Sequence, residues 1–569
     1  MKKLLLTFLL ATAGLSCWAT DYYLVGDGTT IGWTTGTGNR APTKMTETSI
    51  SGVYVWTGPL KHASEGFYIC DGPSVWSGYG SSVDKANGSY AISETGGTDN
   101  CKQTDNKWNP TNTDWQYYTI TLNTNNSTMS WASVGAADGD GYYSIGNAAT
   151  LYCFSSVVNQ YDTSAKAKLT ADINYSAYPQ GFIGTSSNKF AGTFDGQGHT
   201  ISLALVSDAA IRGLFAFINN ATIRNLIVDG SITSSFKNIG GLGGQINGSS
   251  TVENVLVKTT LNYSGTGSDA SAGGIFPYVD TGSSLILRNC AFVGSIKVGT
   301  AQGNAGLVSW NSGSLQATNC LIAPAEVVAN EYKDYTRGNA ASATNCYSVS
   351  STDARLASGE LCYLLNGSTC YNPNWTQTIG TDNLPVPFTT QGIVNKIPSA
   401  GYATQFIPTT DVTIPAGVEA FAGVVNADRL RLIPISGKIK QGEPVVLKGS
   451  EGFYSFVPTT GASAAASNSL SGSDGTASGT GIYALSDQDG VGFFPVDSGI
   501  AIPAGKAYLS DGAGVKGFTF LFDDDATGID DVNGQWSMVN GQSIHNVAGQ
   551  RMSKMHKGIN ILNGKKVLK

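Results

Sequence analysis

Charged side chains are scarce in this 569-residue chain. Asp, Glu, Lys and Arg together make up 13% of it, against a usual share of about a quarter. Long solvent-facing helices need these residues, whereas 71 glycines and 10% aromatics are typical of strands joined by tight turns. The net charge of −7 gives no electrostatic support for nucleic-acid binding. The composition therefore predicts an all-β protein.

Long apolar runs are confined to the beginning of the chain. Residues 1–19 combine two lysines, the largely apolar stretch Leu4–Leu10 and small residues before a cut after Ala19, which is the pattern of a cleaved signal peptide. A lipoprotein acylated at Cys17 is the alternative. No later run reaches about 18 apolar residues. We expect an exported protein, extracellular or at the outer-membrane surface, without a transmembrane span.

The chain has nine cysteines, and signal cleavage removes Cys17. An exported chain can oxidise the others, but their wide spread does not indicate a compact disulfide scaffold. The sequence leaves two pairings open, Cys70 with Cys101 and Cys362 with Cys370.

Residues 20–135 alternate short β-prone segments with Gly, Asn and Ser turns. The segments DYYLVG, GVYVWTG, GFYICDG and WQYYTITL predict a β-sandwich. DYYLVGDGTTIGW, SGVYVWTGPL and EGFYICDG also resemble modules of the outer-membrane starch-binding lipoproteins of Bacteroidota. This resemblance implies a carbohydrate-binding domain that binds a glycan without cleaving it.

Two turn-rich stretches of this module, DGPSVWSGYGSS and TDNKWNPTNTD, carry large aromatics on predicted loops. A sugar ring can stack on an exposed indole while amide and ammonium groups bond its hydroxyls. Trp33, which follows a glycine, and Trp56, within a strand, are assigned to the core. We expect Trp76 and Trp108 to be partly exposed and to share one ligand. The predicted glycan site comprises Trp76, Tyr79, Trp108, Lys107 and Asn109.

An internal repeat with a period near 30 residues lies within 136–395. No helical pattern separates its β-prone segments, so the repeat predicts a right-handed parallel β-helix with one coil per copy. One Asn recurs in each copy, and coils about 4.8 Å apart would join these amides in a hydrogen-bonded ladder. Spacings of 29, 35, 30 and 26 residues separate Asn225, Asn254, Asn289, Asn319 and Asn345.

The position after each ladder Asn is apolar. Leu and Val occupy it in the first two coils and Cys in the next three, which indicates an interior slot where a free thiol behaves as a small hydrophobe. The parallel Cβ bonds of stacked coils suit a disulfide poorly. We therefore expect buried, reduced thiols at Cys290, Cys320 and Cys346.

The same alignment predicts an interior aliphatic column of Leu214, Leu242, Ile275 and Leu307. Residues three positions further along a strand face the opposite side. They form an outward column in which three of the four residues are aromatic, a second candidate stacking surface unless another segment covers it. This column contains Phe217, Gln245, Tyr278 and Trp310.

RGLFAFINNATIRNLIV and GGLGGQINGSSTVENVLV resemble the GLUG-motif β-helices of bacterial surface proteins, and ASGELCYLLNGSTC resembles their closing cap. The resemblance implies an adhesin-like setting and supplies no catalytic residue.

Residues 396–526, with short apolar strands at roughly ten-residue spacing, predict a second β-sandwich. This part resembles a C-terminal module of Bacteroidota surface proteins. Residues 527–569 predict a short β tail similar to type IX sorting domains.

Catalytic groups are sparse in the coils. Hydrolysis of a glycosidic bond needs paired carboxylates, and neither Asp195 nor Asp229 has a second carboxylate in its slot. His199 is assigned to a turn, and four histidines are a poor supply for a triad or a zinc site. We therefore expect no catalytic residue, no metal and no cofactor.

The expected function is that of a non-enzymatic, adhesin-like protein. It would present a lectin-like domain on a β-helix stalk to a polysaccharide, a glycoconjugate or a host surface. A polysaccharide lyase or glycoside hydrolase with its site on the β-helix is the alternative, and a stalk without a ligand is a third possibility.

Overall fold

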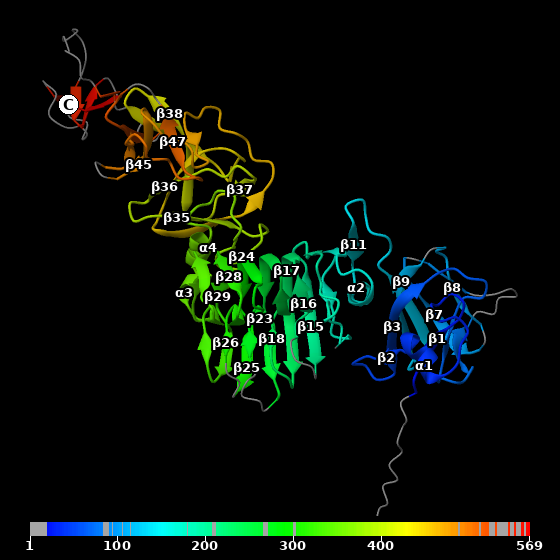
Figure 1. The fold of residues 1–569 in the computed structure, drawn as a ribbon. Coiled ribbons are helices and arrows are strands. Elements are labelled where there is room, and N and C mark those ends of the chain that lie inside the picture. The colour runs from blue at the N-terminus through cyan, green and yellow to red at the C-terminus, as the bar shows by residue number, and fades with distance from the viewer. Residues whose placement is uncertain are drawn as a thin grey trace, which may run out of the picture. The chain divides into compact units, whose positions relative to one another are not determined.

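The computed structural model describes residues 20–522 except 83–89, 94, 105, 114, 179, 208–211, 266–270, 300–302, 488–489 and 511–513, and the backbone of short strands between 530 and 568. The chain is all-β, with 48% strand against 6% helix. It forms two compact units, drawn in Figure 1. The first runs to Ala317 and includes Ile322–Ser342; the second comprises Thr318–Leu321 and the chain from Ala343. The predicted signal peptide, residues 1–19, lies outside the described residues.

The first unit begins with a sandwich-like β module. Eight strands follow one another in the order β1-β4-β5-β7-β10-β9-β3-β2. Their bounds are Tyr23–Val25 (β1), Thr46–Glu47 (β2), Val53–Leu60 (β3), Tyr68–Cys70 (β4), Gly78–Ser81 (β5), Gly97–Gln103 (β7), Gln116–Asn123 (β9) and Thr128–Ser133 (β10). Two more strands, β6 (Tyr90–Ile92) and β8 (Trp108–Pro110), pair in parallel.

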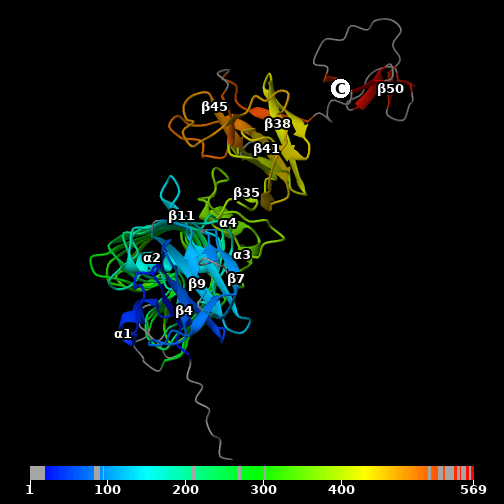
Figure 2. The same ribbon diagram turned by 90° about the vertical axis from the view of Figure 1, so that its right-hand side faces the viewer.

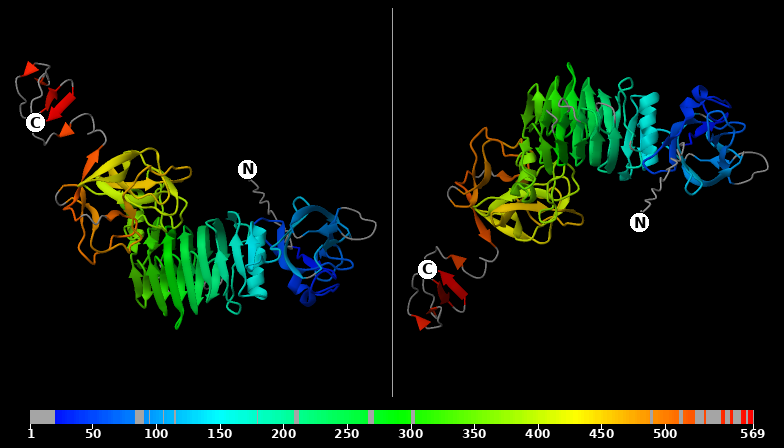
Figure 3. Two further views of the ribbon diagram at one scale, coloured as in Figure 1. Left: turned by 90° about the horizontal axis from the view of Figure 1, so that it is seen from above. Right: turned by 90° about the horizontal axis from the view of Figure 1, so that it is seen from below.

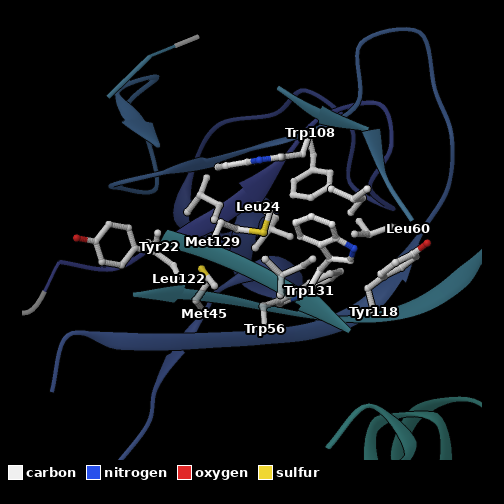
Figure 4. Close-up of a cluster of buried hydrophobic side chains, with 14 of the residues drawn as sticks. Tyr22, Leu24, Met45, Trp56, Leu60, Trp108, Tyr118, Leu122, Met129 and Trp131 are labelled. Atoms are coloured by element: carbon white, nitrogen blue, oxygen red, sulfur yellow. The ribbon is translucent and has the colours of Figure 1, made fainter. Parts of the chain in front are cut away.

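The core of this module is rich in aromatic and sulfur-containing side chains (Figure 4). Trp56 on β3 is 5% exposed, which confirms its assignment to the core. Its indole Nε1 donates to the Pro42 carbonyl at 3.0 Å, so the polar edge of the ring is satisfied.

One helix, α2 (Ala148–Gln160), stands where the sequence predicted only strands. Asn147 caps it, because its side chain accepts from the Thr150 amide at 3.0 Å. Phe154 on the inner face contacts the rings of Phe190 and Phe194, at centroid distances of 6.2 and 6.0 Å. The helix therefore packs against the apolar interior of the first coils.

The chain then forms a parallel β-solenoid of about 6 turns, whose first strand precedes α2 and whose other strands follow it (Figure 3). Its longest sheet runs through β11 (Tyr142–Ile145), β12 (Lys166–Leu169), β14 (Thr193–Asp195), β17 (Thr222–Ser234), β20 (Ser249–Val257), β24 (Ser284–Phe292) and β28 (Ser314–Thr318). A second sheet runs through β16 (Phe215–Asn219), β19 (Gly243–Asn247), β23 (Phe276–Val279), β27 (Val308–Asn311) and β32 (Thr336–Gly338). The repeat is thus the β-helix that the sequence predicts.

The predicted asparagine ladder is present. The Asn254 amide donates to Asn225 at 3.1 Å, and the Asn289 amide donates to Asn254 at 3.0 Å. In the second unit the Asn345 amide donates to Asn319 at 2.9 Å and to the carbonyls of α4 (Glu360–Leu365).

All five ladder residues have φ between 51° and 54°. Asn adopts this left-handed conformation more readily than most residues. It bends the strand at a corner: in β17 the residues before Asn225 pair with β14, and those after it pair with β15 (Thr200–Ser207). The repeated Asn therefore serves both the corner and the ladder.

A buried carboxylate begins the ladder. Asp195 is 3% exposed and accepts from the Asn225 amide at 3.1 Å and from Arg224 at 2.7 Å. Burial by itself would raise the pKa of Asp195, but hydrogen bonds from Asn225, from the Gln197 amide and from Arg224 outweigh it and lower this pKa. Asp195 is therefore a structural anion.

The thiol column has the predicted register, because Leu226 pairs with Val255 and Val255 with Cys290. Cys290 and Cys320 are fully buried, whereas Cys346 is only partly buried. The Cys320 amide lies 3.4 Å from the Cys346 sulfur, and none of the three thiols forms a disulfide. The four cysteines whose pairing the sequence left open are also free and buried: Cys70, Cys101, Cys362 and Cys370.

We expect the native protein to react negligibly with a thiol reagent such as DTNB, apart from slow labelling at Cys346. Burial raises the pKa of Cys101 to about 11 and that of Cys153 to about 12, so little thiolate is available at mildly alkaline pH. All eight thiols of the described chain should react in denaturant. Rapid labelling of the thiols in the folded protein, or a protein mass lowered by the loss of hydrogens in disulfides, would contradict this register.

The second unit contains the helices α3 (Ala354–Ala357) and α4, followed by a β module (Figure 2). Its main sheet has the order β36-β41-β38-β39-β48-β46-β45-β47-β44. The bounds are Tyr402–Gln405 (β36), Val418–Asn426 (β38), Arg429–Ile435 (β39), Val445–Gly449 (β41), Ser471–Gly472 (β44), Ile482–Ser486 (β45), Gly492–Pro495 (β46), Ala507–Ser510 (β47) and Phe518–Phe522 (β48). The module begins slightly before the predicted boundary, because β35 (Ile393–Ile397) pairs with β42 (Gly452–Phe456).

Short strands also occur in the tail. They are β49 (Asp530–Asp531), β50 (Ile544–Asn546), β51 (Arg551–Met552), β52 (Ile559–Leu562) and β53 (Lys565–Leu568). Among the described residues, no helix has the length and apolar character needed to cross a membrane.

Candidate functional site

Two exposed indoles lie next to each other on the N-terminal module. Trp76 is 51% exposed and Trp33 is 38% exposed. Their ring centroids are 6.3 Å apart and the ring planes meet at 50°. An exposed aromatic pair of this kind is unusual on a soluble domain and is typical of binding surfaces.

Two loops carry these rings. Trp33 ends a turn that follows β1 and is closed by a backbone bond from Gly26 to the Gly32 carbonyl. Only glycine fits at Gly26, because a Cβ there would lie 2.0 Å from the Gly66 carbonyl oxygen. Trp76 lies in the hairpin between β4 and β5, which Ser77 closes by donating to Asp71 at 2.6 Å.

Arg40, at the end of the short helix α1 (Thr37–Arg40), ties the two loops together. The side chain is fully buried, and its Nε donates to the Thr34 carbonyl, next to Trp33, at 2.7 Å. Its Nη1 donates to the carbonyls of Gly72 and Val75, in the Trp76 loop, at 2.7 and 2.9 Å. The guanidinium also lies 4.8 Å from the centroid of the Trp76 ring. The indoles are therefore held in place before any ligand arrives.

A cation and a buried tyrosine complete this surface. The Lys107 ammonium lies 5.4 Å from the centroid of the Trp33 ring. The Tyr68 hydroxyl donates to the Trp76 carbonyl at 2.9 Å, and its ring packs against Trp33 at 5.8 Å. We call Trp33, Trp76, Arg40 and Lys107 the Trp platform. Its ring surface suits an apolar face of a ligand, and Lys107 supplies a hydrogen-bond donor at the edge.

The assignment of Trp108 to a binding loop is wrong. Trp108 lies on β8, is 0% exposed, and its indole Nε1 donates to the buried Asp99 carboxylate at 2.9 Å. Figure 4 shows the residue among the core side chains. The turn formers beside it suggested a loop, but Asn109 is itself buried. The Asn109 amide bonds both backbone groups of Ala63, at 2.6 and 3.1 Å, so it is a structural residue and not a ligand contact.

Of the predicted site residues, the structure brings Trp76 and Lys107 to one surface. Tyr79, on β5, is partly buried and packs against the core residue Tyr22, with centroids 6.0 Å apart. The assignment of Trp33 to the core was also wrong. The glycine- and threonine-rich turn GDGTTIGW, which ends at this ring, is the signal that could have marked it as a loop residue.

The outward column on the solenoid has the predicted register. Phe217 pairs with Gln245, Gln245 with Tyr278 and Tyr278 with Trp310. Phe217 and Tyr278 are partly exposed, and Trp310 is 39% exposed. The aliphatic residues of the opposite column are fully buried. These aromatics are therefore not covered by another segment of the described chain and form a second candidate surface.

The carboxylates and histidine considered for catalysis make structural contacts. His199 Nδ1 lies 3.1 Å from Asp172, and Asp229 accepts from the neighbouring Gly230 amide at 2.6 Å. Asp195 is committed to the asparagine ladder. Within the described part of the chain, no three His, Cys, Asp or Glu side chains gather in a way that could hold a metal ion.

Comparison with known proteins adds little to this geometry. No protein-family model and no curated protein matches the chain. Among solved structures, a Bacteroides ovatus protein provisionally described as an immunoglobulin A1 protease is similar over 44% of this chain and 94% of its own. The sequence identity is 16% and the TM-score is 0.27. A similarity at this level carries no inference about activity.

Proposed function

We propose that this protein is a non-enzymatic, adhesin-like protein that binds glycans through the Trp platform and is exported to the cell surface or beyond. The tail at 527–569 would serve in export or retention. The single observation that supports glycan binding is the pair of exposed, adjacent indoles on loops fixed by a buried arginine. A pyranose ring has an apolar face that stacks on an indole and hydroxyls that accept from an ammonium group such as that of Lys107.

Rigidity favours this function over that of a loop anchor. Arg40 uses three hydrogen bonds to hold the two loops, yet it leaves half of the Trp76 surface in solvent. A residue that serves only as an anchor would bury its ring. A rigid surface loses little conformational entropy on binding, so a small contact area can still give useful affinity.

Trp76→Ala should weaken glycan binding about tenfold. A loss of ~1.4 kcal/mol corresponds to this factor and lies within the range of a single aromatic contact. The full chain is screened on a glycan array, and the best ligand is then titrated by calorimetry into the wild type, Trp76→Ala and Trp33→Ala. Both variants should bind more weakly while their unfolding transitions stay unchanged.

Trp115→Ala is the matched control. Trp115 is 44% exposed on the same module and has the Lys61 ammonium 4.7 Å above its ring, so it offers an equally exposed indole with a cation at a different place. Full binding by both platform variants, or no binding by the wild type to any arrayed glycan, would refute the proposal. New reducing ends or unsaturated products from a bound polysaccharide would refute its non-enzymatic part.

A further inference from the structure

We propose that the solenoid has its own binding strip for an extended, uncharged polysaccharide, separate from the Trp platform. The strip consists of the outward column Phe217, Gln245, Tyr278, Trp310 and Arg337, together with the polar residues beside it. This inference rests on the proposed glycan-binding function and adds the class of ligand, a polymer.

The strip has the dimensions of several sugar rings. Neighbouring strands of a sheet are about 4.8 Å apart, so the three strand steps from Phe217 to Trp310 span about 14 Å. The Trp platform, with centroids 6.3 Å apart, presents a much smaller surface. A chain laid along the solenoid axis would therefore meet successive side chains of one column, whereas a single sugar would use only one of them.

Polar groups accompany the rings at the spacing of the coils. Asp280, which follows β23, accepts from Gln245 at 3.0 Å and from Asn247 at 2.8 Å. Asn219 pairs with Asn247 in the neighbouring coil. Amide and carboxylate groups next to an aromatic surface are the partners that sugar hydroxyls require. Each coil thus offers either a ring or a hydrogen-bonding group.

Trp310 is held with its ring partly in solvent. Its indole Nε1 donates to the Ser312 hydroxyl at 2.8 Å, and the Arg337 guanidinium lies 4.9 Å from the ring centroid. One contact comes from Ser312, just after β27, and the other from Arg337 on the neighbouring strand β32. The exposed part of the indole is therefore presented in one orientation.

The charge of the strip favours an uncharged ligand. It carries one carboxylate, Asp280, and one guanidinium, Arg337, which lies against Trp310. A polyanion such as a polyuronate would meet no cluster of cations here and would be repelled by Asp280. The hydroxyl groups of a neutral polymer match the amides instead.

The experiment compares a polymer with its own fragments. Full-length wild type, Tyr278→Ala/Trp310→Ala and Trp33→Ala/Trp76→Ala are run by affinity electrophoresis in gels containing starch, xylan, a mixed-linkage β-glucan or polygalacturonate. Disaccharides of the same polymers are titrated in solution. Phe236→Ala is the control for the strip, because Phe236 is a 50% exposed aromatic of the solenoid outside the column.

We expect the strip variant to bind one neutral polymer at least about tenfold more weakly, to bind disaccharides like the wild type, and to stay monodisperse. If every neutral polymer retards the strip variant as strongly as it retards the wild type, the proposal that the strip binds a polysaccharide is refuted. So does preferential binding of polygalacturonate, or a change in oligomeric state that shows the strip to be a self-association surface. If the platform variant binds normally and the strip variant does not, the Trp platform is refuted and the strip is supported. If the strip variant binds normally and the platform variant does not, the strip is refuted and the Trp platform is supported.

Discussion

Trp108→Ala is expected to destabilise the N-terminal module by about 3–5 kcal/mol, the usual range for removing a buried Trp or Phe side chain. The indole is completely buried, so its loss leaves a cavity. The substitution also leaves the Asp99 carboxylate, 7% exposed, without the donor that it has at 2.9 Å. The module should unfold at a much lower denaturant concentration, and glycan binding should fail together with folding.

Tryptophan fluorescence during urea unfolding measures this effect, because most of the indoles belong to this module. Trp108→Phe fills most of the cavity and should lose less stability. Trp76→Ala, on an exposed ring, should change it by no more than about 0.5 kcal/mol. If Trp108→Ala kept wild-type stability but no longer bound the glycan, Trp108 would have to be a binding residue and not a core residue.

Asn254→Ala is expected to lower the stability of the solenoid by about 2–5 kcal/mol. Two amide hydrogen bonds are lost, at 3.1 and 3.0 Å, each contributing about 0.5–1.5 kcal/mol. Ala also has to adopt φ near 53°, which costs about 1–2 kcal/mol in the left-handed region. Hydrogen exchange followed by mass spectrometry should show faster exchange in β17, β20 and β24.

Asn254→Gly separates the two contributions. Glycine accepts the left-handed φ without strain, so this variant avoids the backbone penalty of Ala and should be more stable than Asn254→Ala. Equal stability of the two variants would show that the backbone conformation contributes nothing. Wild-type stability of both would show that the ladder is not a source of stability.

The solenoid could be predicted from the sequence because a repeat copies one environment many times. Five asparagines at comparable spacing set the register, and the same register placed Cys290 inside and Trp310 outside. The N-terminal module has no such repetition. Trp76 and Trp108 both stand among turn-forming residues, and what separates them is a distant partner. Asp99 accepts from one indole, and Arg40 supports the loop of the other. Neither partner is visible in the local pattern.

Helix α2 was missed for a related reason. Its sequence AATLYCFSSVVNQ combines β-branched, aromatic and serine residues, which favour strands or turns. Burial against Phe190 and Phe194, together with the Asn147 cap, overrides those preferences.

The position of α2 has a consequence for assembly. Among the described strands, β11 is at the end of the longest sheet of the solenoid and pairs with β12 alone. The first coil thus presents the kind of strand edge on which another chain can add. Fibres of the cross-β type grow by such addition. By packing against the apolar end of the coils, α2 blocks the stacking of a second solenoid onto the first. The length of the solenoid is then fixed by the sequence of a single chain, and it does not grow by end-to-end association at high protein concentration.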